Sequence, residues 1–198
     1  MTLRPAAFLD RDGVINLDRG YVSRAEDFEF VTGVFEGAAA LQRLGFALVV
    51  ITNQSGIGRG LYSESNFLAL TRWMSDQFEQ HSVHIDGVFY CPHHPTEAFG
   101  HYRRECDCRK PAPGMLLRAA RELNLDLTRS ATFGDRVSDL QAAAAAGVPL
   151  LYLLGTNGSS LPTPAAAEGL STAEFSSLQQ AAASAEVHDA VSLLVSTP

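Results

Sequence analysis

The chain has 198 residues, of which 46% are hydrophobic and 19% are charged, and its formal net charge is −7 at pH 7. This composition is that of a globular domain with a full core, and the negative charge argues against broad binding to nucleic acid or anionic membranes. No apolar run approaches the roughly 20 residues of a membrane-spanning helix, and Asp10 comes too early for a secretory signal. We therefore expect one cytoplasmic domain over residues 1–198, with a monomer as the default state.

Short apolar runs alternate with helical patterns from residue 6 to residue 154. The runs are hydrophobic nearly throughout, as strands covered on both faces are. In chain order we expect a strand at 6–9, a helix at 33–45, a strand at 46–51, a helix at 63–81, a strand at 86–90, a helix at 113–124, a strand at 130–133, a helix at 138–147 and a strand at 149–154. This alternation predicts a three-layer α/β fold, in which a Rossmann-like parallel sheet has helices on both faces.

The segment 156–198 has a different composition, rich in Ala, Ser and Thr. Its pattern predicts a weak closing helix over residues 186–195, and the sequence assigns no structure to the rest of the segment.

Acidic and polar side chains follow three of the predicted strands. Asp10 and Asp12 end the first strand, residues 52–55 end the second, and Asp135 and Asp139 follow the fourth. Ligands of such sheets sit beyond the carboxyl ends of the strands, and residues i and i+2 of an extended segment share a side. Close carboxylates repel each other, so we expect a divalent cation, and magnesium suits oxygen ligands. The alternative is that the first pair merely caps turns, which the second acidic pair disfavours.

The three cysteines all lie between residues 91 and 108 and cannot all pair within one chain. With a neighbouring histidine they give the spacing C-x-H, twelve residues, C-x-C, which offers three thiolates and one imidazole. Four protein ligands make a closed tetrahedral site, so we expect structural zinc rather than catalytic zinc. The predicted ligands are Cys91, His93, Cys106 and Cys108, with His94 as the alternative to His93. The competing interpretation is three reduced cysteines that happen to share a loop.

Four motifs, in this order, resemble the haloacid dehalogenase superfamily of phosphotransferases. They are DRDG at 10–13, TNQSG at 52–56, KPAPG at 110–114 and GDRVSD at 134–139. The resemblance extends over about residues 6–150. It implies that Asp10 attacks phosphorus to form an aspartyl-phosphate, and that Asp12 protonates the leaving oxygen and later activates a water. It also implies magnesium held by Asp10, the backbone carbonyl of Asp12 and Asp135.

The resemblance also implies which residues stabilise the transferred phosphoryl group. Thr52 and the residues after it, Asn53, Gln54 and Ser55, would bind phosphoryl oxygens. Lys110 would supply positive charge to these oxygens and to the nucleophile. Asp139 would orient Lys110 rather than bind the metal.

The cysteine loop, residues 91–110, narrows the resemblance to a subgroup with a zinc loop in place of a large cap domain. This subgroup includes phosphatases of D-glycero-D-manno-heptose 1,7-bisphosphate and of histidinol phosphate. The heptose enzymes are the closer match, because segments such as FLDRDGVIN and GFALVVITNQSGIGRG resemble theirs. This match implies that Asp18, Arg19, Gly20 and Tyr21 lie over the sugar. A second phosphate would bind Arg109 and Arg136, with Arg59 less favoured.

Three functions stay open at this point, and Arg136 is one reason. Heptose enzymes often carry lysine at that position, whereas histidinol-phosphate relatives carry arginine, although arginine also binds phosphate. The leading hypothesis is a magnesium-dependent phosphatase that removes the 7-phosphate of the heptose bisphosphate. The second is a histidinol-phosphate phosphatase, and the third is a zinc-stabilised phosphate-binding module without turnover. The sequence leaves the heptose anomer open.

Overall fold

The computed structural model describes residues 3–155, 171–184 and 187–190. Within them, six strands form one parallel sheet in the order β3-β2-β1-β4-β5-β6. The strands are β1 Arg4–Leu9, β2 Ala47–Asn53, β3 Gly87–Cys91, β4 Leu125–Gly134, β5 Leu150–Leu154 and β6 Ser171–Phe175. The strand order reverses at β1, which places the ends of β1, β2 and β4 beside one another.

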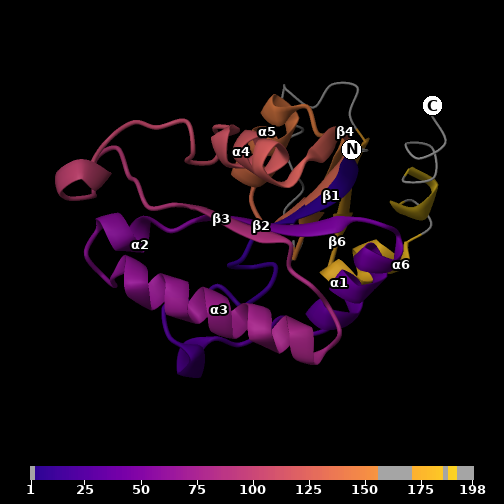
Figure 1. The fold of residues 1–198 in the computed structure, drawn as a ribbon, viewed down its shortest axis with the longest axis horizontal. Coiled ribbons are helices and arrows are strands. Elements are labelled where there is room, and N and C mark those ends of the chain that lie inside the picture. The colour runs from indigo at the N-terminus through magenta and orange to yellow at the C-terminus, as the bar shows by residue number, and fades with distance from the viewer. Residues whose placement is uncertain (1–2, 156–170, 185–186, 191–198) are drawn as a thin grey trace.

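Helices cover both faces of the sheet, as Figure 1 shows. On one face lie α1, α3 and α6, and on the other lie α4 and α5. Their bounds are α1 Val34–Arg43, α2 Ser55–Gly58, α3 Glu64–Gln80, α4 Gly114–Leu123, α5 Val137–Ala146 and α6 Leu178–Ala183, with short 3-10 turns η1 Ala25–Asp27 and η2 Gly100–Tyr102. The predicted three-layer α/β fold is thus confirmed.

Strand β1 shows how the sequence fills both layers of the core. Ala7 and Leu9 point to the layer that contains α1 and α3, whereas Ala6 and Phe8 point to the layer that contains α4 and α5. All four side chains are at most 1% exposed. Because successive side chains of a strand alternate between faces, a strand covered on both sides must be apolar at every position. The uninterrupted run at 6–9 therefore has a direct structural cause.

The predicted strands and helices at 6–154 are all present, with ends that differ by a few residues. The largest difference is β4, which begins at Leu125 rather than at residue 130. Its first half carries charged residues and so lacks the apolar run of a buried strand. The Ser130 hydroxyl accepts a hydrogen bond from the Ala6 amide at 2.9 Å, where the register of β1 and β4 shifts. None of the helices in the described part of the chain is long and apolar enough to cross a membrane.

The C-terminal segment adds one strand and one helix that the sequence pattern did not reveal. Strand β6 extends the sheet beyond β5, and α6 packs on α1. Of the predicted helix at 186–195, residues 187–190 are helical and the others lie outside the described residues. The contact between the two helices depends on Gly37, because a Cβ at this position would lie 2.7 Å from the backbone nitrogen of Gln179.

We predict that Gly37→Ala lowers the free energy of unfolding by roughly 1–3 kcal/mol, because the new methyl group meets the backbone of α6. Alanine is otherwise favoured over glycine within a helix, so a loss of stability reports the packing contact. Urea unfolding measures this change. The matched control is Glu36→Ala on the exposed side of α1, which should change stability by less than about 0.5 kcal/mol. Equal effects of the two substitutions would contradict the packing role of Gly37.

Candidate active site

A cavity of about 590 Å³ opens beyond the carboxyl ends of β1 and β2. It collects most of the predicted phosphate-binding and sugar-binding residues from four separate stretches of the chain. The predicted residues that line it are Asp10, Asp12, Asp18, Gly20, Tyr21, Thr52, Asn53, Gln54, Ser55, Arg109, Lys110 and Arg136. The topology brings them together because parallel strands end at the same edge of the sheet.

Lys110 is one of the most buried of these residues, and its side chain is 4% exposed. Its Nζ lies 2.9 Å from Asp10 Oδ1 and 2.7 Å from Asp139 Oδ1. It also donates a hydrogen bond to the carbonyl oxygen of Ile51 at 2.9 Å. An ammonium group has three donors, so all three have a protein acceptor. Asp139 is therefore placed to hold Lys110, as the resemblance implies.

Carboxylate oxygens of Asp10, Asp135 and Asp139 lie within 4.8 Å of one another. Burial raises the pKa of Asp135 to about 6 and that of Asp10 above its usual range, although the Lys110 ammonium opposes the second shift. The Oδ1 atom of Asp135 is buried without a hydrogen-bond partner. Both oxygens of Asp139 are occupied, Oδ1 by Lys110 and Oδ2 by the Arg136 amide at 3.0 Å, so Asp10 and Asp135 are the carboxylates with an oxygen left for a cation. This oxygen donor set fits magnesium, which needs few protein ligands.

The Asp12 carboxylate lies outside that cluster and is held by three nitrogen donors. Arg11 Nη2 contacts both of its oxygens at 2.8 Å, Asn16 Nδ2 lies 3.0 Å from Oδ1, and Gln54 Nε2 lies 3.0 Å from Oδ2. Arg11 is 2% exposed and Asn16 is fully buried. The two aspartates of DRDG thus have different surroundings. Sequence reasoning missed Arg11 and Asn16, because a buried arginine inside an acidic motif has no periodic signal.

The side chains of Asn53 and Gln54 form hydrogen bonds with different parts of the site. The Asn53 side chain accepts a hydrogen bond from the Lys110 amide and donates one to the Lys110 carbonyl, both at 3.1 Å. Gln54 Nε2 donates to Thr52 Oγ1 at 2.9 Å as well as to Asp12. Because Thr52 Oγ1 accepts this bond, its own hydrogen stays available to a phosphoryl oxygen.

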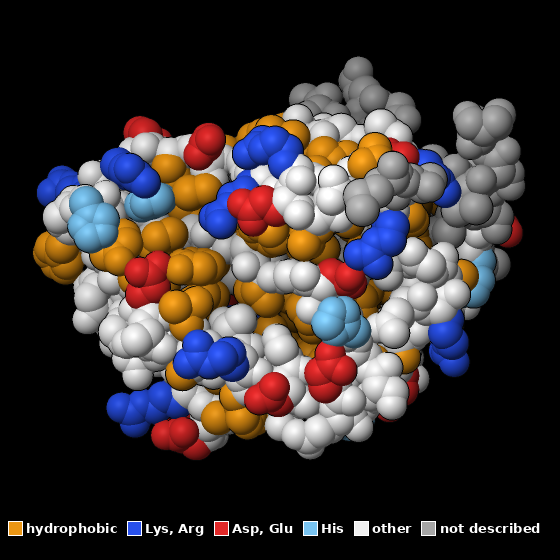
Figure 2. Space-filling model, viewed as in Figure 1, with side chains coloured by type: hydrophobic (Ala, Val, Ile, Leu, Met, Phe, Trp, Pro, Cys, Tyr) orange, Lys and Arg blue, Asp and Glu red, His pale blue; other side chains and the backbone are white. Residues whose placement is uncertain are grey.

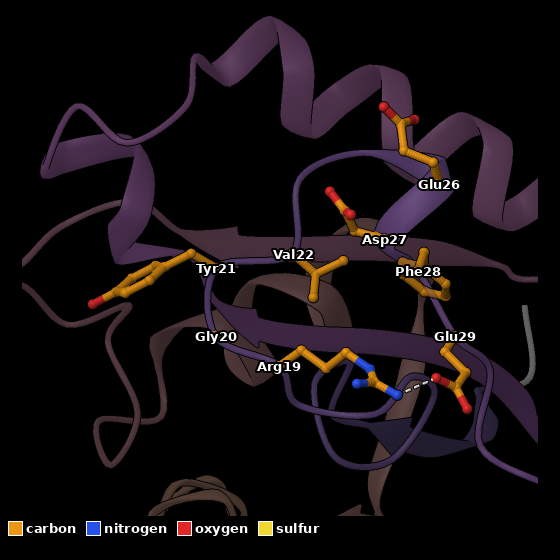
Figure 3. Close-up of a pocket in the computed structure, with 8 residues that line it drawn as sticks. All are labelled: Arg19, Gly20, Tyr21, Val22, Glu26, Asp27, Phe28 and Glu29. Carbon is orange, nitrogen blue, oxygen red and sulfur yellow. Dashed lines mark hydrogen bonds and ion pairs between the residues drawn. The ribbon is translucent and has the colours of Figure 1, made fainter.

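The predicted sugar loop, residues 18–21, divides between two cavities. Asp18 Oδ2 pairs with Arg136 Nη2 at 2.7 Å at the rim of the main cavity. Arg19 instead forms an ion pair with Glu29 and lines a neighbouring cavity (Figure 3). The structure therefore does not place Arg19 among the residues that line the main cavity. Arg59, on the other hand, lines the main cavity and lies 5.6 Å from the centre of the Tyr21 ring.

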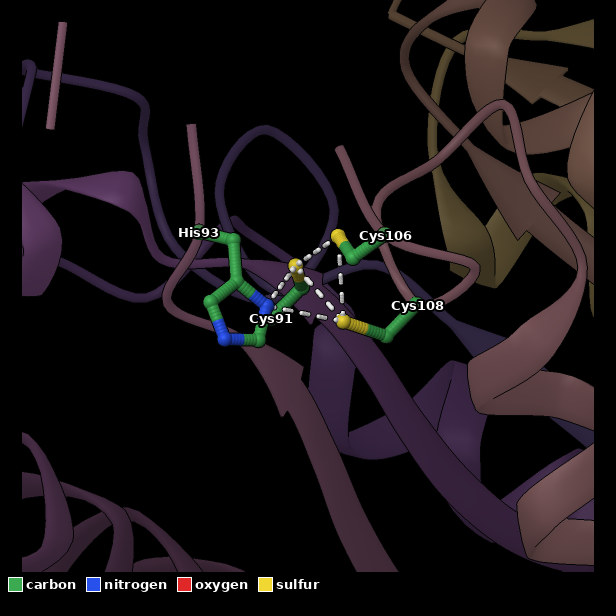
Figure 4. A group of neighbouring side chains, drawn as sticks. All are labelled: Cys91, His93, Cys106 and Cys108. Atoms are coloured by element: carbon green, nitrogen blue, oxygen red, sulfur yellow. Dashed lines mark hydrogen bonds between the residues drawn. The ribbon is translucent and has the colours of Figure 1, made fainter. Parts of the chain in front are cut away.

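The four predicted zinc ligands converge on one point, as Figure 4 shows. The Cys91–Cys108, Cys106–Cys108 and Cys91–Cys106 sulfur distances are 3.0, 3.4 and 3.6 Å, and His93 Nδ1 lies 3.6 Å from Cys91 Sγ and 3.2 Å from Cys108 Sγ. Bond lengths to tetrahedral zinc place ligand atoms roughly 3.5–3.8 Å apart, so the donor set fits this metal with a small expansion.

The two neighbouring histidines have separate roles in this loop. Burial lowers the pKa of His93 and favours the neutral imidazole that binds metals. Metal at Nδ1 would put the ring proton on Nε2, so Arg104, whose Nη2 lies 2.8 Å from Nε2, would have to move. His94 Nδ1 instead accepts from the amide of Glu97 at 3.0 Å and stands outside the cluster.

Comparison with known proteins identifies the family. Residues 107–173 match the HAD-hydrolase-like family model. D-glycero-beta-D-manno-heptose-1,7-bisphosphate 7-phosphatase of Vibrio cholerae is 50% identical over 176 residues, which cover 89% of this chain and 93% of that protein. The protein of the same name from Photorhabdus laumondii is 51% identical over 152 residues, or 77% of this chain and 81% of the relative. The chain belongs to this phosphatase family.

The similarity to this family also holds for the three-dimensional structure. The chain is similar to the crystal structure of D,D-heptose 1,7-bisphosphate phosphatase from B. bronchiseptica complexed with magnesium and phosphate, with 33% identity and a TM-score of 0.74. The match covers 90% of this chain and 96% of that structure. The resemblance to the haloacid dehalogenase superfamily is thus confirmed, the chain is a phosphomonoester hydrolase, and the superfamily implies dependence on magnesium.

We predict that Gly13→Ala lowers phosphatase activity by about a hundredfold or more, because small displacements in an active site have effects of this size. Gly13 has a φ of +93°, and a Cβ there would lie 2.3 Å from Asp135 Oδ2. The matched control is Gly45→Ala, which has a φ of +91° and no atom within 4 Å of the new Cβ. Both variants bear the strain of positive φ, but the control should keep its activity. Equal activities would refute a role for the close approach to Asp135.

Proposed function

We propose that the cavity hydrolyses the 7-phosphate of D-glycero-β-D-manno-heptose 1,7-bisphosphate and releases the heptose 1-phosphate. The observation that carries this proposal is the division of the DRDG carboxylates, because Asp10 is held by Lys110 whereas Asp12 is held apart from the acidic cluster. Curated relatives at about 50% identity have the corresponding name, which also specifies the β-anomer that the sequence left open.

Asp10 is the nucleophile in this mechanism. Its Oδ1 accepts from the Arg11 amide at 2.8 Å and is paired with Lys110 at 2.9 Å, so we assign Oδ2 to the attack. A bond forms between Oδ2 and phosphorus while the bond from phosphorus to the C7 oxygen breaks. Asp12 gives its proton to that oxygen and becomes a carboxylate. It then takes a proton from a water that attacks the aspartyl-phosphate, which releases phosphate and restores both aspartates.

The charge of the phosphoryl group is matched by several residues of the cavity. The Thr52 hydroxyl donates to a phosphoryl oxygen, and the Lys110 ammonium, whose three hydrogen bonds go to Asp10, Asp139 and Ile51, contributes its positive charge. We propose that Asp10, Asp135 and the backbone carbonyl of Asp12 hold magnesium, which when bound neutralises charge between the carboxylate and the phosphate. The oxygen donors and the unpartnered Asp135 Oδ1 support this assignment.

The second phosphate needs cations at some distance from the nucleophile. Arg109 and Arg136 both line the cavity and come from separate segments, which supports their assignment to the 1-phosphate. Arg136 is 65% exposed and already paired with Asp18, so it can exchange this partner for a phosphate at low cost. Histidinol phosphate carries an amine and lacks a second phosphate, and two arginines at the rim suit it poorly.

We propose a structural role for zinc in the loop at 91–110. Four protein ligands leave no open position for a substrate or water. Cys108 directly precedes Arg109 and Lys110, so the metal site would fix the start of the segment that carries both cations. Free thiols suit a cytoplasmic protein. On the face seen in Figure 2, basic and acidic side chains are interspersed, which supports a small phosphorylated sugar as the partner rather than nucleic acid or an anionic membrane. We also propose that the protein is a monomer.

The proposed substrate is tested by phosphate release from the β-heptose bisphosphate, its α-anomer and histidinol phosphate. We expect the highest kcat/KM for the β-anomer and the loss of turnover in Asp10→Asn to below about one part in a hundred, because no aspartyl-phosphate can form. Circular dichroism checks that the variant keeps its fold. Preference for histidinol phosphate would refute the heptose assignment, and substantial activity of Asp10→Asn would refute the covalent mechanism.

The two proposed metals differ in how easily they leave. Brief EDTA treatment should remove magnesium, and added magnesium should restore activity, since few protein groups hold it. Zinc should stay at about one atom per chain, because three thiolates and an imidazole hold it. Cys106→Ser should lower zinc content and reduce activity through Lys110. Elemental analysis beside activity measures both effects, and a zinc-free Cys106→Ser protein with full activity would overturn the positional role of the loop.

A further inference from the structure

Tyr62 lines the active-site cavity and has a hydrogen bond that the mechanism above does not use. Its hydroxyl lies 2.6 Å from Gln54 Oε1, and because Oε1 can only accept, the hydroxyl is the donor. The opposite end of the same amide, Nε2, donates to Asp12 Oδ2 at 3.0 Å and to Thr52 Oγ1 at 2.9 Å. A continuous chain of hydrogen bonds thus runs from Tyr62 through Gln54 to the proposed acid.

We propose that Tyr62 is a positioning residue for Asp12, which it orients through the side-chain amide of Gln54. This inference rests on the proposed role of Asp12 as the acid that protonates the leaving group. The two ends of a glutamine amide have nearly the same shape, so the amide has two orientations that differ only in their donors and acceptors. Tyr62 favours the one in which the carbonyl faces away from Asp12.

The orientation matters most when Asp12 carries its proton. An ionised Asp12 itself favours the NH2 group of Gln54, because a carboxylate only accepts hydrogen bonds. A protonated Asp12 could instead donate to the carbonyl of a rotated Gln54, and its proton would then point away from the leaving oxygen. In the rotated amide the Tyr62 hydroxyl would face the NH2 group and could only accept from it, so its own proton would lose Oε1 as acceptor, and the hydroxyl therefore opposes this rotation. The proton therefore stays directed towards the substrate.

The seating of the Tyr62 ring supports a fixed position for its hydroxyl. A Cβ at residue 56 would lie 2.3 Å from Cε1 and 2.7 Å from the hydroxyl oxygen of Tyr62, so the glycine of α2 leaves the space that the ring fills. Burial, the largest cause, raises the pKa of Tyr62 to about 12, and the hydroxyl keeps the proton that it donates.

The test compares two substrates in the variant Tyr62→Phe, which keeps the ring and removes the hydroxyl. The heptose bisphosphate has an alkoxide leaving group that needs a proton, whereas 4-nitrophenyl phosphate leaves as a phenolate without one. The quantity measured is the ratio of kcat/KM for the bisphosphate to kcat/KM for the aryl phosphate. A general acid contributes a large factor to the first substrate, so we expect Tyr62→Phe to lower this ratio about tenfold. Weaker positioning of Thr52 would affect both substrates and cancel in the ratio.

Two further variants make the result decisive. Asp12→Asn should lower the ratio more than Tyr62→Phe does, because it removes the acid itself. Tyr90→Phe removes a hydroxyl bonded to Glu64, outside the residues that line the cavity, and should leave the ratio unchanged. A normal ratio in Tyr62→Phe beside a lowered ratio in Asp12→Asn would overturn the positioning role alone. A normal ratio in Asp12→Asn would overturn the acid role in the proposed function, and with it this inference.

Discussion

The burial of one ammonium group, that of Lys110, constrains the whole active site. Removing such a charge from water has a penalty of several kcal/mol unless it is paired and hydrogen-bonded. Its three acceptors come from three elements, since Asp10 follows β1, Ile51 lies in β2 and Asp139 lies in α5. The penalty is offset only when all three are in place. The charge of Lys110 therefore ties together the strand ends that form the cavity.

The path of the chain to Lys110 explains why the Cys/His cluster stands next to the cavity. The segment between β3 and α4 contains little regular structure apart from η2, so a metal at its four clustered ligands would add to the order that its backbone hydrogen bonds provide. Cys91 ends β3, and its carbonyl accepts a hydrogen bond from the Gln54 amide at 2.8 Å. Cys108 stands two residues before Lys110, whose backbone Asn53 holds from the other side. The cluster and the cavity thus share the same segments of backbone.

Periodicity and short motifs predicted five of the six strands in the described sheet, four helices and the clustering of the acidic and sulfur ligands, because these features are local in sequence or follow from strand ends. The remaining parts depend on contacts between distant residues. Strand β6 and helix α6 lie in an Ala/Ser-rich segment with a weak apolar pattern, and α6 packs on α1 where Gly37 leaves room. Arg19 follows Asp18 directly, yet its ion pair with Glu29 takes it to another cavity. No pattern around Tyr62 indicates its bond to Gln54.

The surroundings of the two DRDG carboxylates explain how one motif can supply two chemical roles. Asp10 contacts the Lys110 ammonium, which favours the charged form that a nucleophile needs and so opposes the effects of burial and of the neighbouring Asp135 and Asp139 carboxylates. Asp12 is two residues away but its carboxylate faces side-chain donors, among them the neutral amides of Asn16 and Gln54. The two amides and the Arg11 guanidinium, which contacts both Asp12 oxygens at 2.8 Å, can stay in place while a proton leaves and returns, whereas a metal bound directly to the carboxylate would compete with that proton. The separation of Asp12 from the acidic cluster is therefore what allows it to exchange protons in both steps.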